Sequence, residues 1–176
     1  KPGSKTDRLV SFDDFGPTAL SLTGLDVPDY MDGKSYLGSR PDKPREFVYG
    51  HRDRVDEVHD LARCVRDDRY LYIRNFMPHF GYNQRTFWPD LGEIRHEFYR
   101  LADPEKMTAP QWHFAGPSRP LEELYDRQTD PLNLHNIADS KEHRKVLNKM
   151  RGELFRHIRE SRDLGFLPEA LAWDIS

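Results

Sequence analysis

The sequence has a single cysteine, Cys64, among its 176 residues. One cysteine cannot form an internal disulfide, and without a second there is no C-x-x-C motif for a metal ion or a redox reaction. We therefore expect Cys64 to be a small core residue.

No run of residues reaches the apolar length of a transmembrane helix, so we expect no membrane partner. Residues 1–5 lack the hydrophobic segment of a signal peptide, so no targeting segment is visible. The start at Lys-Pro-Gly-Ser-Lys, without Met, is typical of a linker in a partial chain.

The sequence also lacks an excess of charge of one sign. The 27 Lys and Arg residues and 30 Asp and Glu residues leave a net charge of −3, and the two signs are interleaved along the chain. There is no basic patch of the kind that nucleic acid requires, so we expect no nucleic-acid partner. The hydrophobic fraction, 36%, is low, whereas the aromatic fraction of 12% argues against disorder. We expect a modest core rich in Phe and Tyr.

Common catalytic motifs are absent as well. The sequence contains no H-E-x-x-H, P-loop or G-x-S-x-G pattern, and its eight histidines are scattered. One dense polar cluster, residues 51–59, follows a β-like run, and loops at strand ends often carry binding sites. Its arginines and histidine suit an anion such as sulfate or a carboxylate. The alternative is a solvated charged loop whose ion pairs contribute little. The candidate substrate-binding residues are His51, Arg52, Asp53 and Arg54.

Periodicity and turn residues predict a small sheet with flanking helices. Strand patterns cover residues 47–51, 62–66 and 70–75, a polar turn makes the last two a tight hairpin, and Leu124–Tyr125 is a further strand candidate. Helix signals cover the following ranges: about 14–23, near 90–102, and 140 to about 161. The fold class is α+β, a small antiparallel sheet with flanking helices.

Two features of these segments complete the prediction. The last helix carries an apolar stripe from Val146 to Ile158, which is more typical of core packing than of a partner site, and Asp139 or Ser140 can act as its N-cap. Pro, Gly and Asp recur across residues 26–45, which we expect to be loop.

Three segments resemble one protein family in order and spacing. Residues 9–37, LVSFDDFGPTALSLTGLDVPDYMDGKSYL, are similar to the "VS.VDL.PT.L.LAG...P..M.G.S.L" segment of the formylglycine-dependent sulfatases. Residues 49–57, YGHRDRVDE, followed by Arg63, Val65-Arg66, Arg69-Tyr70 and residues 72–75, resemble the C-terminal subdomain of the branch similar to heparan N-sulfatase. Residues 123–138, ELYDRQTDPLNLHNIA, resemble "ELYDL..DP.E..NLA", which is the last strand of the family's small sheet, its turn and the cap of the final helix.

The resemblance implies a domain division. Residues 1–45 would be the end of the large catalytic domain, with the helix at about 14–23, and a linker. Residues 46–176 would be the C-terminal subdomain of an alkaline-phosphatase-like α/β sulfatase, with its long terminal helix. The implied partners are the N-terminal catalytic domain of the same enzyme and a sulfated sugar substrate. The implied location is exported, either periplasmic or extracellular, or lysosomal.

The resemblance also implies a function for the whole enzyme: hydrolysis of sulfate esters or sulfamates, as in glycosaminoglycans. The family's C/S-x-P-x-R motif, which yields the formylglycine nucleophile, does not occur here, because the sequences around Cys64 and Ser118 both fail it. Formylglycine and Ca²⁺ are therefore expected in the missing N-terminal portion, with none bound by this segment. We expect this segment to supply packing and part of the substrate cleft, and to be inactive alone.

Two alternative functions remain open at this point. The first is a non-catalytic module that binds sulfated glycans or another partner, and the second is part of a related phosphonate or phosphodiester hydrolase that shares the architecture. Binding by the isolated chain tests the first alternative, and substrate profiling of the intact enzyme tests the second.

Overall fold

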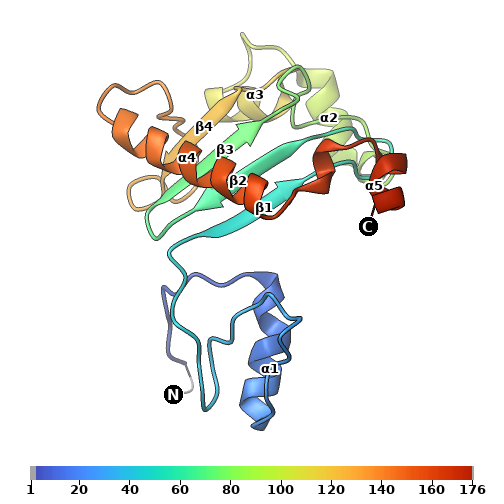
Figure 1. The fold of residues 1–176 in the computed structure, drawn as a ribbon. Coiled ribbons are helices and arrows are strands. Elements are labelled where there is room, and N and C mark those ends of the chain that lie inside the picture. Colours follow the sequence, from blue (N-terminus) through green and yellow to red (C-terminus); the bar gives the residue numbers. More distant parts are fainter. Residues whose placement is uncertain (1–2, 176) are drawn as a thin grey trace.

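The computed structural model describes residues 3–175, and its centre is a four-stranded antiparallel sheet (Figure 1). The strands follow one another in chain order: β1 (Val48–Arg52), β2 (Ala62–Arg66), β3 (Tyr70–Asn75) and β4 (Glu122–Asp126). The predicted hairpin is confirmed, since Asp67 N–H donates to the Tyr70 carbonyl at 3.0 Å. All four predicted strands exist, and the first is shifted by one residue.

One face of the sheet is covered by the long helix α4 (Arg144–Glu160), as Figure 1 shows. The predicted apolar stripe packs there, because residues three and four apart share one side of a helix. The core consists of one residue each from β2, β3 and β4, one from the loop before α4, and three from α4: Val65, Tyr72, Leu124, Ala138, Leu147, Met150 and Leu154. The expectation of a core rich in Phe is wrong, because no Phe of the described chain is buried and the core is mainly aliphatic.

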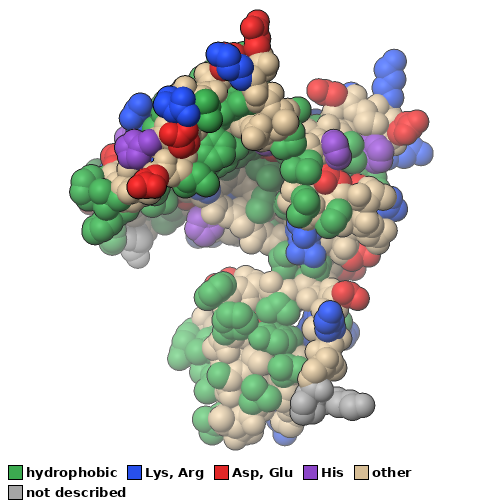
Figure 2. Space-filling model, turned by 180° about the vertical axis from the view of Figure 1, so that it is seen from behind, with side chains coloured by type: hydrophobic (Ala, Val, Ile, Leu, Met, Phe, Trp, Pro, Cys, Tyr) green, Lys and Arg blue, Asp and Glu red, His purple; other side chains and the backbone are tan. Residues whose placement is uncertain are grey.

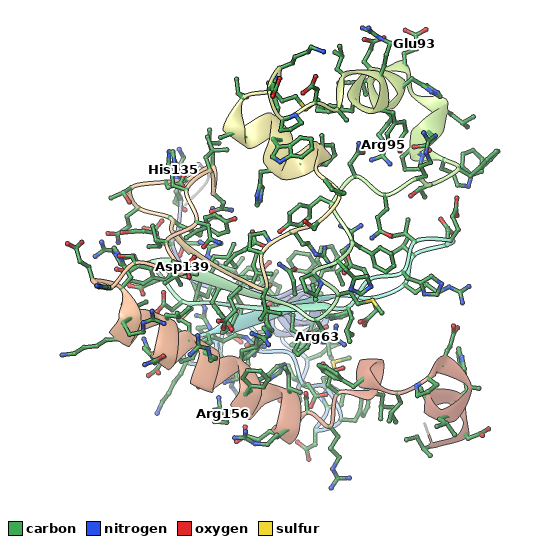
Figure 3. All side chains as sticks on the ribbon, turned by 90° about the horizontal axis from the view of Figure 1, so that it is seen from above. Arg63, Glu93, Arg95, His135, Asp139 and Arg156 are labelled. Carbon is green, nitrogen blue, oxygen red and sulfur yellow. The ribbon has the colours of Figure 1, made fainter. Side chains whose placement is uncertain are left out.

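The opposite face is covered by the long segment between β3 and β4, so that the sheet lies between two layers (Figure 3). This segment contains η2 (Pro89–Leu91), α2 (Glu93–Leu101) and α3 (Ala109–Ala115). The helix expected near 90–102 is confirmed. Helix α3 was missed, although Thr108 and Gln111 form a capping box with the T-x-x-Q spacing that marks a helix start.

The N-terminal residues form a separate unit beside β1 (Figure 1). It contains η1 (Phe12–Asp14) and α1 (Phe15–Thr23), which ends at Gly24 with a φ of 79°, a conformation that favours glycine. Residues 26–45 have neither helix nor strand, as predicted. The carboxylate of Asp14 holds the unit together by accepting hydrogen bonds from the Ser11 and Lys34 backbone N–H groups and from Arg45.

The structure corrects three further expectations. Helix α4 begins after His143, so neither Asp139 nor Ser140 is its N-cap; the Ser140 hydroxyl is hydrogen-bonded to His143 Nδ1 instead, at 2.9 Å. Cys64 is half-buried and lies outside the main core, because side chains alternate along β2 and its neighbour Val65 is the one on the face that α4 covers. Two short helices after α4, η3 (Leu164–Phe166) and α5 (Glu169–Ile175), were not predicted.

Within residues 3–175 no helix is both long and apolar enough to cross a membrane.

Candidate functional site

A cavity of about 650 Å³ lies where the N-terminal unit, strand β1 and the C-terminal end of α4 meet. Figure 2 shows the hollow between the N-terminal unit and the body of the molecule from behind. Asp13, Asp32 and Arg45 line it on one side. On the other side the lining comes from strands β1 and β2, from α4 and from the turn that follows α4.

Arg63 on β2 organises the sheet side of this cavity. Its side chain is 4% exposed, and it donates to Asp163 through Nε and through Nη2, the latter at 2.9 Å from Oδ1. Its Nη1 donates to Asp53 Oδ1 at 2.7 Å. Figure 3 shows Arg63 beside the C-terminal half of α4. The guanidinium thus joins β2, the loop after β1 and the turn after α4, and we call Arg63, Asp53 and Asp163 the arginine clasp.

The clasp affects the pKa of Asp163 and leaves little space for a side chain at Gly165. The hydrogen bonds from Arg63 are the main cause that holds the pKa of Asp163 below its ordinary value, and the charge of His51 adds to the effect. A Cβ atom added at Gly165 would lie 2.1 Å from Arg63 Nη2, so the turn after α4 can approach the guanidinium only with glycine at this position.

A second group on the cavity wall joins β1 to α4. The rings of Tyr49 and His157 stack with centroids 3.5 Å apart and an interplanar angle of 5°. Burial lowers the pKa of His157. The Tyr49 hydroxyl donates to Glu153, which also accepts from Arg156.

The four predicted site residues separate into two pairs. His51 and Asp53 line the cavity. The side chain of Arg52 pairs with the buried Asp60, with Nε and Oδ2 3.0 Å apart, and Arg54 pairs with Glu169 of α5 at 3.1 Å. Because both arginines that suggested an anion site are engaged away from the cavity, only His51 and Asp53 are placed to touch a ligand there. Their role in substrate binding stays a prediction.

Sequence reasoning did not find Arg63 or Asp163. Arg63 belongs to the segment that resembles the heparan N-sulfatase branch, but that resemblance gave it no role, and Asp163 lies 100 positions further along the chain. A second signal was indirect: Arg63 lies directly opposite His51 in the register of β1 and β2, so a prediction of that register would have placed it beside the candidate cluster.

The other face of the sheet carries a buried polar network. Glu123 of β4, 1% exposed, accepts hydrogen bonds from Asn75 Nδ2 at 2.6 Å and from the hydroxyls of Tyr82 and Tyr125. Burial and the Glu123 carboxylate raise the pKa values of both tyrosines. His113 Nε2 of α3 lies 3.6 Å from Glu123 Oε2. The network attaches the covering segment to the sheet and is best explained as structural.

The arrangement does not by itself support covalent or metal chemistry. Among the described residues no group of three or more His, Cys, Asp or Glu side chains is placed to hold a metal ion. Burial raises the pKa of the Cys64 thiol, which is the opposite of what an activated nucleophile needs. The cavity is therefore a candidate for binding rather than for bond breaking.

Comparisons with known proteins show what the chain is similar to, although no family model matches it. Two ulvan-active sulfatases from Formosa agariphila are 36% identical over 163 residues and 30% identical over 171 residues, each alignment covering 93% of this chain. The chain spans only 27% and 32% of their respective lengths. A solved 2-O GAG sulfatase superposes with a TM-score of 0.60 at 23% identity, over 92% of this chain and 27% of that one.

These likenesses confirm the resemblance to sulfatases and the predicted fold class; the heparan N-sulfatase branch, which none of these relatives names, stays a prediction. The chain is therefore similar to a C-terminal segment of sulfatases over nearly its whole length, and it has the fold of the corresponding subdomain of an alkaline-phosphatase-like sulfatase.

Proposed function

We propose that this chain is the C-terminal part of an enzyme that hydrolyses sulfate esters or sulfamates of sulfated carbohydrates. The observation that carries the proposal is the alignment of 93% of the chain with an ulvan-active sulfatase at 36% identity. The second ulvan-active relative, at 30% identity, supports the same substrate class. Export of the intact enzyme to the periplasm or the extracellular space, or delivery to a lysosome, is part of the proposal and rests on family resemblance alone.

In this proposal the chain contributes packing surface to a catalytic domain. Four apolar side chains on and near α1 are 48–85% exposed, namely Phe12, Phe15, Leu22 and Leu25. Exposed apolar surface of this kind marks an interaction site. Because the relatives are about three to four times as long as the matched segment, the N-terminal catalytic domain of the same enzyme is the proposed partner for this surface.

The formylglycine and calcium of the family do not fit the residues of this chain. The C/S-x-P-x-R motif is absent from the sequence, and no described cluster of acidic or histidine side chains could hold a calcium ion. We assign both groups to the catalytic domain and derive no step through them here. What the chain itself supplies is one wall of a cleft, with His51 and Asp53 in contact with the substrate.

The proposal is tested by measuring sulfate release by the intact protein. We expect release from ulvan or from sulfated glycosaminoglycan oligosaccharides, detected by ion chromatography. If phosphonates or phosphodiesters are hydrolysed and sulfate is not released, the related hydrolase function is correct instead. Binding of sulfated glycans without any turnover would support the non-catalytic module.

The contribution of the cavity is tested by His51→Ala in the intact protein. His51 lies on the surface of the cavity and makes no hydrogen bond with another described side chain that would be lost on truncation. We expect the KM for the sulfated sugar to rise about three- to tenfold, the loss of one hydrogen bond to the ligand, while the unfolding temperature stays unchanged. An unchanged KM would remove His51 from the substrate site.

A further inference from the structure

The charges of the cavity are distributed in a way that does not suit a sulfate group. Each of its three arginines is already paired: Arg45 with Asp14, Arg63 with the clasp aspartates, and Arg156 with two glutamates of α4. Four aspartates also line it: Asp13, Asp32, Asp53 and Asp163. A sulfate here would meet carboxylates without a free guanidinium to balance them, and like charges at close range repel.

The same surface is well suited to hydroxyl groups. Asp53 Oδ1 is taken by Arg63, whereas Oδ2 has no hydrogen-bond partner among residues 3–175, and the side chain is 36% exposed. His51 stands on the same wall and offers a ring nitrogen as donor or acceptor. A sugar hydroxyl donates one hydrogen bond and accepts others, so a carboxylate acceptor beside an imidazole can engage two neighbouring hydroxyls.

The clasp makes this acceptor rigid. Arg63 is 4% exposed on its side chain and also donates from Nη1 to its neighbour, the Ala62 carbonyl, at 2.9 Å. Its guanidinium lies 5.2 Å from the ring centroid of Phe166 in the turn after α4. With its position determined by bonds to Asp163, Arg63 holds the Asp53 carboxylate in one orientation, and a preorganised acceptor binds its ligand at a lower entropic cost.

We propose that this cavity recognises the hydroxyl groups of the sugar ring of the substrate and not its sulfate, with Asp53 as the acceptor that touches the sugar and Arg63 as the residue that positions Asp53. This inference rests on the proposed function for the identity of the ligand. It assigns binding roles to Arg63 and to the turn that carries Asp163, neither of which belongs to the predicted cluster at 51–54.

The test compares two substrates in the intact protein. One is a sulfated ulvan oligosaccharide, and the other is a small aryl sulfate, which has no sugar hydroxyls. Asp53→Asn and Arg63→Lys should each raise the KM for the oligosaccharide about tenfold, the loss of one charge-assisted hydrogen bond, with kcat changed less than twofold. The kinetics with the aryl sulfate should stay unchanged, because that substrate does not use the acceptor.

The matched control is Arg69→Lys. Arg69 also makes a bidentate contact with an aspartate, Asp126, with Nη2 and Oδ2 2.6 Å apart, but at the far end of the sheet and outside the cavity. It should leave KM unchanged for both substrates. Equal losses on both substrates in the clasp variants would show a purely structural role and overturn the proposal, as would unchanged KM values on both.

A binding measurement separates this inference from the proposed function. Calorimetric titration of the intact protein with a chemically desulfated ulvan oligosaccharide should show binding that Asp53→Asn weakens about tenfold. If the wild-type protein releases no sulfate but binds this oligosaccharide through Asp53, the proposed hydrolysis fails and the sugar-hydroxyl site stands. If the desulfated oligosaccharide does not bind, the sugar-hydroxyl site is wrong whatever the activity.

Discussion

At the scale of single residues, Gly165 shows how closely the turn after α4 approaches the sheet. The nearest atoms to a Cβ at this position would be Arg63 Nη2 at 2.1 Å and Asp53 Oδ2 at 2.9 Å. Both atoms lie at the tips of side chains, but neither can move freely, because the hydrogen bonds of the arginine clasp fix both side chains. Alanine here must displace the guanidinium or the turn.

We therefore predict that Gly165→Ala destabilises the protein by about 1–3 kcal/mol, the usual range for overpacking. Gly152 provides the matched control, since it lies inside α4 with no atom within 4 Å of a Cβ built on it. Gly152→Ala should stabilise the protein by about 0.5–1 kcal/mol through helix propensity. Urea unfolding of both variants checks the pair, and a Gly165→Ala protein as stable as the wild type would contradict the close packing.

At the scale of elements, α4 contributes the largest share of the core. Leu147, Met150 and Leu154 are each 0–1% exposed and pack against the sheet, whereas the opposite side of the helix carries Arg156 and other charged residues. Burial of such a stripe, rather than helix propensity, stabilises a helix of this kind in a folded protein.

Leu147→Ala should accordingly destabilise the protein by about 2–5 kcal/mol, because it leaves a cavity between α4 and the sheet. Lys145→Ala, an exposed change in the same helix, should alter stability by no more than about 0.5 kcal/mol. Thermal unfolding followed by circular dichroism measures both. A cost for Leu147→Ala below about 1 kcal/mol would mean that α4 does not depend on this contact.

At the scale of the whole molecule, ion pairs connect segments that are distant in sequence. Arg69 joins the turn before β3 to Asp126 of β4, Arg63 joins β2 to Asp163, and Arg151 of α4 binds Glu122 of β4. The pKa of each of the three carboxyl groups is held below its ordinary value, and the hydrogen bonds from the arginine are the largest cause of this shift. The folded state therefore binds fewer protons than the unfolded chain in the acidic range.

This difference predicts how stability depends on pH. The contribution of these carboxylates is fully present above their unfolded pKa values, about 4, and is lost as the pH falls through their lower folded pKa values. The half-buried His157 has a pKa lowered from 6.5, so its contribution is fully present above pH 6.5 and begins to be lost below it, earlier than that of the carboxylates. Urea midpoints measured from pH 7 to pH 3 should decrease throughout, most steeply below about pH 4. Asp126→Asn should flatten the acidic part of the curve, and an unchanged slope would exclude Asp126 as a contributor.

The sequence alone was sufficient for most of the regular structure. Alternating apolar residues and polar turns located the strands, and helical spacing of apolar residues located α1 and α4. These patterns are local, because their periods follow directly from the backbone geometry of a strand and of a helix. Helices α3 and α5 were missed because each has only seven residues, too few for a periodic stripe. The ordered motifs of residues 9–37, 49–57 and 123–138 were sufficient for the resemblance to sulfatases, which the comparisons confirm.

Only the tertiary structure decided which polar residues meet. In the sequence, residues 51–54 form one cluster, yet side chains alternate across a strand and diverge in the loop beyond it, so Arg52 turns to Asp60 while His51 and Asp53 line the cavity. Conversely, Arg63 and Asp163 are separated by 100 residues and meet because α4 packs across the sheet and returns the chain to the end of β2. Local pattern determined the elements of this protein, and packing between them determined its candidate site.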